Sequence, residues 1–553
     1  MININSNCLC NNFGGKKLDK FEVLNKYFQN IESFRGQQEE AINSVLDGQR
    51  VLCLMPTGEG KSLIYQVAGL CLGKATIIIS PLIALMKQQN NDLANKGLHC
   101  LFLSELDYRK QFKELTKMVD GAVPDFIFIS PERAANDGYL EFILNHIKEK
   151  IGLVVVDEAH CISQWGEGFR PAYKTIPDFV NRIFGWNSWP HILCLTATLN
   201  DRDKKQIEKD FGITKTIKSP NLWRKNLNLN LIDLGSGKED SKDEALERIL
   251  YKHSGEKILV FVHRKYGSKG TTRTLYKRFS QTYNNCDFFD ADISDKEKDR
   301  ILEGFKDGSI KIVFATSAFG MGVDISDIRL VVHYLISESV EQYYQEVGRA
   351  GRDGKPSYGY LLYTKQSKNG RKRLIEGSLC SEKTIRTEYE DRKTKKGAIF
   401  NSIKYEDLAE ERRTAFALLM EFGSIEILAK GVQSLKCFKA SGPKGTLFLE
   451  EMYKISKSGL IKIICKKNGI SINSLTGKIW ELCSKRELVL SSSPPKALFY
   501  CIKQDLDDDI VDKIMNDQQE KLEKRMSAFL DFATAIEDGK NAESIVKNGL
   551  NIK

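Results

Sequence analysis

Short apolar runs recur through the first 365 residues of the chain, and longer amphipathic segments separate them. One series of runs comprises residues 51–55, 75–80, 126–130, 153–156 and 191–196. A second series comprises residues 257–262, 311–315, 330–334 and 358–363. Runs of four to six β-favouring residues between amphipathic helices are typical of βαβ units and a buried parallel sheet. We therefore predict two α/β domains that join near residues 212–234.

The strand rhythm stops after residue 364, so the remainder has another organisation. Residues 410–428 and 473–486 have the pattern of amphipathic helices, and the second is followed by strands at 487–490 and 497–503 with a Ser/Pro turn between them. Helix, strand, tight turn and strand outline a winged helix. An acidic linker is predicted at 505–512 and a last helix at 518–536. The predicted divisions are a tail (1–20), two α/β domains (21–215 and 216–365), a basic helical connector (366–435), a winged helix (436–505), and an acidic linker with a C-terminal helix (506–553).

Composition bounds the possible functions. Apolar residues make up 41% and charged residues 28%, which excludes a wholly disordered or collagen-like chain. The net charge of +10 permits a polyanionic partner, and residues 364–400 hold 11 Lys+Arg against 5 Asp+Glu. There is no apolar run of 18 residues and no signal-peptide pattern at the N-terminus. The 13 cysteines are mostly isolated, so we expect reduced thiols in a cytoplasmic protein without a membrane partner.

A glycine-rich loop follows the first apolar run. The segment 56–62 (PTGEGKS) links the predicted strand to a helix, where backbone N–H groups and the helix dipole can bind phosphate. Lys61 can reach the β- and γ-phosphates, and Ser62 can hold Mg²⁺. Met55 replaces the first glycine of the general pattern, so a glycine-rich turn without a ligand is the alternative. The residues assigned to the nucleotide site by this pattern are Thr57, Gly58, Gly60, Lys61 and Ser62.

Two acids follow a second apolar strand. Residues 153–156 run directly into Asp157 and Glu158, in the sequence DEAH. An acid at the carboxyl end of a parallel strand faces the same crevice as the phosphate loop. Asp157 can complete a Mg²⁺ shell, and Glu158 can orient or deprotonate the attacking water. A solvated acidic cap is the alternative, but two acids directly after four apolar residues fit it poorly. With Lys61, these acids predict a nucleoside triphosphatase.

The order of the motifs resembles that of superfamily 2 helicases and, among them, the RecQ family of DNA helicases. The resemblance covers roughly residues 20–365. Its motifs are FRGQQ (34–38), ISPLIALMK (79–87), SPE (130–132), DEAH (157–160), TAT (196–198), FATSAFGMGVD (314–324) and YYQEVGRAGRDG (343–354). The resemblance implies two tandem RecA-like domains with parallel sheets, which bind ATP and Mg²⁺ between them.

Residue roles follow from the resemblance, position by position. Gln38 would read the adenine edge, and Gln345 would position water or phosphate. Arg349 and Arg352 would reach across the cleft to the γ-phosphate as arginine fingers. Further nucleotide contacts are implied for Arg35, Gly322 and Asp324, and contacts to the nucleic-acid backbone for Ser80 and Thr316.

The most family-specific stretch is residues 161–171 (CISQWGEGFRP), which resembles the aromatic-rich loop of RecQ enzymes that couples DNA binding to hydrolysis. Trp165 and Phe169 offer aromatic faces for base stacking, and Arg170 can bind phosphate. The alternative is that the two aromatic residues belong to the core, although a glycine-punctuated polar loop makes a poor core element.

Several positions depart from the family pattern. Ile31 stands where a tyrosine usually stacks on adenine, which puts base selectivity in doubt. Glu167 and Gly168 replace the usual His and Asp of the aromatic-rich loop, so coupling can differ. Four-thiolate zinc sites need closely spaced cysteine pairs. We predict no structural zinc, because the C-terminal cysteines lie 18 or more residues apart, at Cys380, Cys437, Cys465, Cys483 and Cys501.

The resemblance implies an ATP-dependent DNA helicase that moves 3′ to 5′ on single-stranded DNA and unwinds forked duplexes, in DNA repair or recombination. One alternative is an RNA helicase, because the acid box does not select the sugar. A second is an ATP-driven DNA-binding sensor or translocase subunit of a defence, restriction or repair assembly. The unusual C-terminus keeps this second alternative open.

Overall fold

The computed structural model describes most of the chain, and no described helix is both long and apolar enough to cross a membrane. The described residues are 18–56, 58–103, 107–162, 171–186, 188–197, 201–219, 223–237, 239–264, 267, 269–320, 325–393, 400–492 and 496–550.

Domain 1 is built on a seven-stranded parallel sheet with strand order β3-β4-β2-β5-β6-β1-β7. Its central strands are continuously apolar because helices cover both faces. The strands are β1 (Val51–Leu54), β2 (Ala75–Ile79), β3 (Cys100–Phe102), β4 (Phe126–Ile129), β5 (Ile151–Val156), β6 (His191–Thr196) and β7 (Lys215–Lys218). The helices are α1 (Lys20–Tyr27), α2 (Gln38–Leu46), α3 (Lys61–Leu72), α4 (Ile83–Asn95), α5 (Tyr108–Val119), α6 (Pro131–Asn136), α7 (Gly138–His146), α8 (Pro171–Lys174), α9 (Ile176–Phe184) and α10 (Asp201–Phe211), with short 3-10 turns η2 (Lys148–Lys150) and η3 (Ala159–Ile162).

Domain 2 repeats this plan with a six-stranded parallel sheet in the order β10-β11-β9-β12-β13-β8. The strands are β8 (Leu227–Asp233), β9 (Ile258–Phe261), β10 (Cys286–Phe289), β11 (Ile312–Ala315), β12 (Leu330–His333) and β13 (Ser357–Tyr363). The helices are α11 (Glu239–Lys252), α12 (Thr272–Phe279), α13 (Asp295–Asp307) and α14 (Val340–Val347), with the 3-10 turn η4 (Ser317–Gly320). The two sheets confirm the predicted pair of α/β domains.

A small antiparallel sheet follows domain 2, after α15 (Lys365–Glu376) and α16 (Glu382–Arg392). It consists of β14 (Asn401–Ile403), β18 (Lys496–Ile502) and β15 (Ile425–Val432). The prediction of one helix over 410–428 was wrong, because α17 (Glu410–Glu421) ends and β15 begins within that range. Gly423 adopts φ +80°, a left-handed conformation that ends helices, and the isoleucines after it favour a strand.

Three helices and a two-stranded sheet form the next unit, in the outline of a winged helix. It comprises β16 (Phe438–Ala440), η6 (Leu435–Cys437), α18 (Pro443–Ile455), α19 (Ile461–Asn468), α20 (Ile472–Ser484) and β17 (Leu488–Leu490). The predicted strand at 497–503 is present as β18, but it pairs with β14 and β15 instead of forming a wing with β17. Its residues Ala497 to Tyr500 are buried there, which explains the different pairing.

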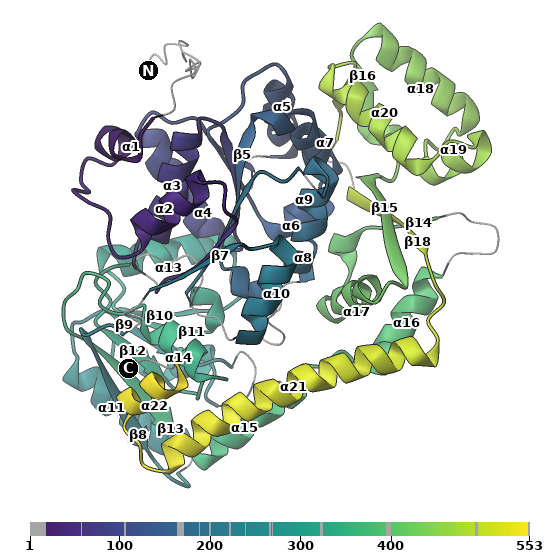
Figure 1. The fold of residues 1–553 in the computed structure, drawn as a ribbon. Coiled ribbons are helices and arrows are strands. Elements are labelled where there is room, and N and C mark those ends of the chain that lie inside the picture. Colours follow the sequence, from purple (N-terminus) through teal and green to yellow (C-terminus); the bar gives the residue numbers. More distant parts are fainter. Residues whose placement is uncertain are drawn as a thin grey trace.

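The antiparallel sheet and the winged-helix outline, residues 400–502, are together called the C-terminal unit. This unit packs on domain 1 and shares its hydrophobic core (Figure 1). Trp480 of α20 lies 5.4 Å from Tyr139 of α7, between ring centroids. Lys430 of β15 donates to the carboxylate of Glu141 at 2.7 Å. A Cβ built on Gly138 would lie 2.1 Å from the backbone oxygen of Lys430, so only glycine permits this close approach. The third helix of the winged-helix outline is therefore an interface element.

The last two helices return to domain 2. α21 spans Asp508–Glu537 and α22 spans Ala542–Gly549. Figure 1 shows α21, in yellow, running along α15 from the C-terminal unit back to domain 2, where Phe529 and Phe532 enter the core. The predicted linker at 505–512 was wrong: Asp507 caps α21 by accepting from the N–H of Ile510, and acids in a first turn favour a helix.

Candidate nucleotide site between the two domains

The phosphate loop joins β1 to α3 as the sequence predicts. Gly58 and Gly60 adopt φ +89° and +74°, in the left-handed region that favours glycine. Lys61 begins α3, and its Nζ donates to the carbonyl of Met55 at 3.1 Å. The loop therefore presents a helix N-terminus and an ammonium group to the crevice at the carboxyl end of the sheet.

Gln38 holds the backbone of this loop by hydrogen bonds. Its Nε2 donates to the carbonyls of Glu59, at 2.8 Å, and Gly60, at 3.1 Å, while its Oε1 accepts from the N–H of Arg35 at 2.9 Å. A Cβ on Gly60 would lie 2.5 Å from that Nε2. In this structure the Gln38 amide is therefore engaged by the loop backbone, and its predicted role in reading adenine stays a prediction.

The two predicted acids lie at the end of β5, in one hydrogen-bonded group. Asp157 Oδ2 accepts from the Ser80 hydroxyl at 3.0 Å, and Oδ1 accepts from the backbone N–H of Glu158 at 3.0 Å. Glu158 adopts φ +49° and lies 3.2 Å from Nδ1 of His160. His160 Nδ1 also lies 2.9 Å from the Thr196 hydroxyl. Ser80, predicted to contact nucleic acid, thus holds a carboxylate of the acid box.

The surroundings shift the pKa values of Asp157 and Glu158 in opposite directions. Burial and the neighbouring Glu158 raise the pKa of Asp157 to about 6. Burial also acts to raise the pKa of Glu158, but Lys61 and His160, with a contribution from Arg349, lower it overall. Paired acids whose pKa values diverge are characteristic of sites that handle protons or cations.

The residues here suit Mg²⁺ and a triphosphate. The Ser62 hydroxyl accepts from Gln89 Nε2 at 2.8 Å, and with the Asp157 carboxylate it offers hard oxygen ligands of the kind that Mg²⁺ prefers. Ser62 and Asp157 would hold the cation, and Lys61 would bind the phosphates.

Two arginines of domain 2 lie at this site. They follow α14, and a Cβ built on Gly58 would lie 3.9 Å from Cγ of Arg352. Burial and Arg352 lower the pKa of Arg349 to about 10, while Glu346 and Glu158 oppose the shift, so Arg349 lies within electrostatic reach of the acid box. The two domains therefore share one site, with acids from domain 1 and guanidinium groups from domain 2.

For three other predicted residues, the structure gives a position in the fold, and the predicted role stays a prediction. Arg35 lies next to α2, Gln345 lies in α14 and Thr316 lies at the end of β11. Sequence reasoning missed Gln89, whose amide holds Ser62, and Tyr173, whose hydroxyl donates to the carbonyl of Asp157 at 2.8 Å. No motif marks them, because only the fold brings α4 and α8 to the site. The predicted residues that lie outside the described part of the chain are Thr57, Trp165, Phe169, Arg170, Gly322 and Asp324.

Comparisons with known proteins agree with this geometry. Residues 35–207 match the DEAD/DEAH box helicase family, and residues 241–354 match the helicase conserved C-terminal domain. A Bacillus subtilis protein named ATP-dependent DNA helicase RecQ is 34% identical over 370 residues, which cover 66% of this chain and 60% of that protein. A mimivirus protein named putative ATP-dependent RNA helicase R290 is 33% identical over 371 residues, 65% of this chain and 63% of that protein.

Among solved structures, the DEAD-box helicase Mss116 bound to single-stranded RNA and UDP-BeF shares the fold, with a TM-score of 0.52 and 16% identity over 68% of this chain and 83% of that one. The paired parallel sheets and the shared phosphate site define a two-domain superfamily 2 helicase core. Within that class, the two domains of this chain are similar to the RecQ helicases of several bacteria, at 32–34% identity. The chain spans about 60% of the length of the Bacillus subtilis relative.

Proposed function

We propose that this protein hydrolyses ATP with Mg²⁺ and uses the energy to move 3′ to 5′ along single-stranded DNA and separate forked duplexes. The observation that carries the proposal is the shared site: Arg352 reaches the phosphate loop at Gly58, and Arg349 interacts electrostatically with Glu158. A site completed by two domains opens and closes with the nucleotide state, and such a change can shift a strand bound across both domains.

Within this site the chain's own residues divide the work. Lys61 and the loop amides bind and orient the triphosphate, and Glu158 orients and deprotonates the attacking water. Arg349 and Arg352 stabilise the charge that develops on the transferred phosphoryl group. Bound Mg²⁺ supplies further charge neutralisation. The lowered pKa of Glu158 keeps it ionised near neutral pH, so its carboxylate can accept a hydrogen bond from the attacking water and orient it.

The C-terminal unit supports a nucleic-acid partner. Residues 433–503 hold 13 Lys+Arg against 4 Asp+Glu, an excess of nine in a chain whose net charge is +10. Because α20 packs on domain 1, the charge available to a duplex lies on the part of this unit that stays exposed. Seven exposed lysines there make no ion pair with the described residues: Lys436, Lys439, Lys444, Lys454, Lys457, Lys466 and Lys467.

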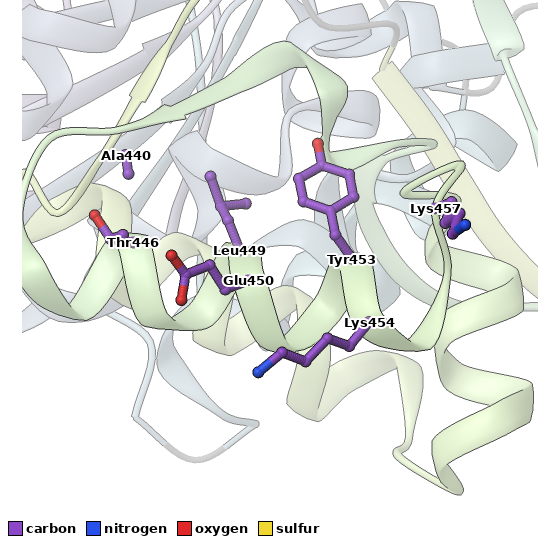
Figure 2. A pocket seen from close by; sticks show the side chains of 7 residues that line it. All are labelled: Ala440, Thr446, Leu449, Glu450, Tyr453, Lys454 and Lys457. Atoms are coloured by element: carbon purple, nitrogen blue, oxygen red, sulfur yellow. The ribbon is translucent and has the colours of Figure 1, made fainter.

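This exposed face also carries a hollow beside α18 (Figure 2). Leu449 and Tyr453 line it together with Lys454 and Lys457. Glu450 lines it too, and Lys454 points away from the Tyr453 ring, so the exposed lysines are what suits a nucleic-acid backbone here. The predicted basic segment 364–400 is a weaker candidate, since Lys368 pairs with Glu537 and Arg386 with Asp508. We propose that the lysine face holds the duplex ahead of the motor.

The test is a forked-duplex unwinding assay run beside a DNA-stimulated ATPase assay on the full chain. The proposal expects ATP hydrolysis stimulated by single-stranded DNA, together with unwinding of a fork that has a 3′ tail. Hydrolysis without unwinding favours the sensor or translocase. Stimulation by RNA alone favours an RNA helicase, the function in the name of the mimivirus relative. Absence of hydrolysis contradicts the proposal.

The pH dependence of ATP turnover reports on Asp157. Its pKa is raised to about 6, so protonation removes the carboxylate as the pH falls through that value. We expect kcat/KM for Mg-ATP to fall about tenfold per pH unit below roughly pH 6. More free Mg²⁺ should move this acid limb to lower pH, because the cation competes with the proton. A limb that is insensitive to Mg²⁺ contradicts the assignment.

Trp165→Ala tests the predicted aromatic-rich loop. Base stacking on an aromatic side chain contributes about 1–3 kcal/mol per base, so the concentration of single-stranded DNA that half-activates the ATPase should rise about tenfold. The basal rate should change less than about twofold. Trp186→Ala, at a tryptophan that is 74% exposed on domain 1, is the matched control and should leave both values unchanged. Equal losses of basal and stimulated rates would show that Trp165 is structural.

A further inference from the structure

A buried carboxylate in α14 accepts hydrogen bonds from two histidines. Glu346 Oε2 lies 3.0 Å from Nε2 of His263 and 2.8 Å from Nε2 of His333. The Ser337 hydroxyl donates to the same oxygen at 3.2 Å, and Gln342 Nε2 donates to Oε1 at 3.1 Å. Four donors therefore fix both oxygens of one carboxylate in the core of domain 2. Sequence reasoning did not single out this group.

The sheet brings the two histidines together. His333 ends β12, and His263 follows the neighbouring parallel strand β9. The Phe261 ring stacks near both imidazoles, with centroid distances of 5.5 Å to His263 and 5.4 Å to His333. His263 adopts φ +52°, a strained conformation for a residue with a side chain. Strain of this kind persists where the surroundings hold the residue firmly, and it concentrates at functional sites.

The donors hold the carboxylate in its ionised form. Nδ1 of each histidine is buried and has no hydrogen-bond partner among the described residues, so each ring contacts Glu346 through Nε2. Burial lowers the pKa of His333. Burial acts to raise the pKa of Glu346, but the histidines lower it overall, well below its usual range. Glu346 is therefore an ionised group that hydrogen bonds from its neighbours hold in place.

The carboxylate of Glu346 lies within electrostatic reach of an arginine of the nucleotide site. Arg349 lies one helical turn further along the chain, and its backbone N–H donates to the carbonyl of Glu346 at 3.2 Å. Glu346 and Glu158 are the two carboxylates that act to raise the pKa of Arg349. One of them belongs to the domain 2 core and the other to the domain 1 site. The guanidinium of Arg349 is thus subject to the negative charges of Glu346 in domain 2 and of Glu158 in domain 1.

A metal site is the competing explanation for two histidines and one glutamate, since such sets hold zinc. Histidines that bind metal almost always donate their other ring N–H to an acceptor, which fixes the ring. Both Nδ1 atoms here lack a partner among the described residues. The contacts at Nε2 are also of ordinary hydrogen-bond length. A hydrogen-bonded network explains the group better than an ion does.

We propose that Glu346 is a positioning residue for Arg349, and that His263 and His333 serve it by fixing the carboxylate. The proposal rests on the proposed ATP hydrolysis, because it assigns the network to the arginine that stabilises the transferred phosphoryl group. It gives the buried histidines a role beyond packing. They hold a charge one turn away from the guanidinium that has to reach across the domain boundary.

The test is a double-mutant cycle on DNA-stimulated ATP hydrolysis. Glu346→Gln removes the charge and keeps the shape, and it should lower kcat about tenfold while KM for ATP changes less than about twofold. In an Arg349→Ala background, followed under single-turnover conditions, Glu346→Gln should cause no further loss beyond about twofold. Equal losses in both backgrounds would show a purely structural role and overturn the proposal.

Substitutions at His333 provide the matched control. His333→Gln retains an N–H donor near the position of Nε2 and should keep kcat within about twofold, whereas His333→Leu removes the donor and should lose about as much as Glu346→Gln. If Glu346→Gln fails to fold by circular dichroism, the same cycle is run with His333→Leu. Equal kcat values for the two His333 variants, or one equivalent of zinc in the purified wild type, would overturn the proposal. Absence of hydrolysis by the wild type would instead contradict the proposed function.

Discussion

Lys61→Ala should lower ATP turnover by about 10³-fold or more without unfolding domain 1. Lys61 begins α3 at the phosphate loop, and its ammonium group is expected to neutralise charge on the transferred phosphate. Its hydrogen bond to the Met55 carbonyl is a single, partly buried contact, so its loss should change stability by no more than about 1 kcal/mol. Steady-state ATPase rates and thermal unfolding measure the two effects.

Lys113→Ala is the matched control for this variant. Lys113 is exposed on α5 of the same domain, away from the phosphate loop, and its removal should leave turnover unchanged. Turnover that survives in Lys61→Ala would mean that the phosphate loop has been assigned to the wrong segment. A loss of turnover that accompanies unfolding of the domain would leave the assignment without support from this variant and require Lys61→Arg, which should also be inactive.

Arg349→Ala and Arg352→Ala should each lower kcat strongly, and the double variant should lose about 10³-fold or more. Nucleotide binding should weaken much less, because domain 1 provides most contacts to the ground state. The physical reason is position: Arg352 lies beside Gly58, and Arg349 interacts with Glu158, although both belong to domain 2. The measurements are kcat and the dissociation constant of a fluorescent ADP analogue.

Arg373→Ala is a suitable control, since Arg373 is exposed on α15 of the connector. It should leave kcat and ADP binding unchanged. If Arg349 and Arg352 can both be replaced with little change in kcat, then domain 1 hydrolyses ATP alone and the two-domain account of the site is wrong. If ADP binding falls as much as kcat, the arginines bind the nucleotide uniformly and do not act as fingers.

The sequence predicted local features well where residue pattern and fold agree. The apolar run at 153–156 became β5, and the glycine loop became the N-terminus of α3, because parallel strands and phosphate loops carry strong local signals. The prediction failed where a single residue determines the end or the start of a helix. Gly423 ends α17 early, and Asp507 starts a 30-residue helix from a run that composition alone would assign to a linker.

Long-range relationships were beyond the sequence pattern. Nothing local indicates that β18 pairs with β15, that Trp480 packs on Tyr139, or that α21 carries the chain back to domain 2. The same holds within the site. The acids and arginines were identifiable by motif, but Gln89 reaches Ser62 only through the packing of α4. The bonds that hold Glu346 likewise depend on the adjacency of β9 and β12.

The central claim is that the triphosphate is bound between the two domains, with acids from one and guanidinium groups from the other. The most direct measurement is a structure of the full chain with ADP-AlF₄⁻, Mg²⁺ and a tailed duplex. The account predicts a guanidinium nitrogen of Arg349 or Arg352 within about 3 Å of the fluoride ligands, with Glu158 beside the attacking water. A nucleotide contacted by domain 1 alone, with both arginines facing solvent, would contradict it.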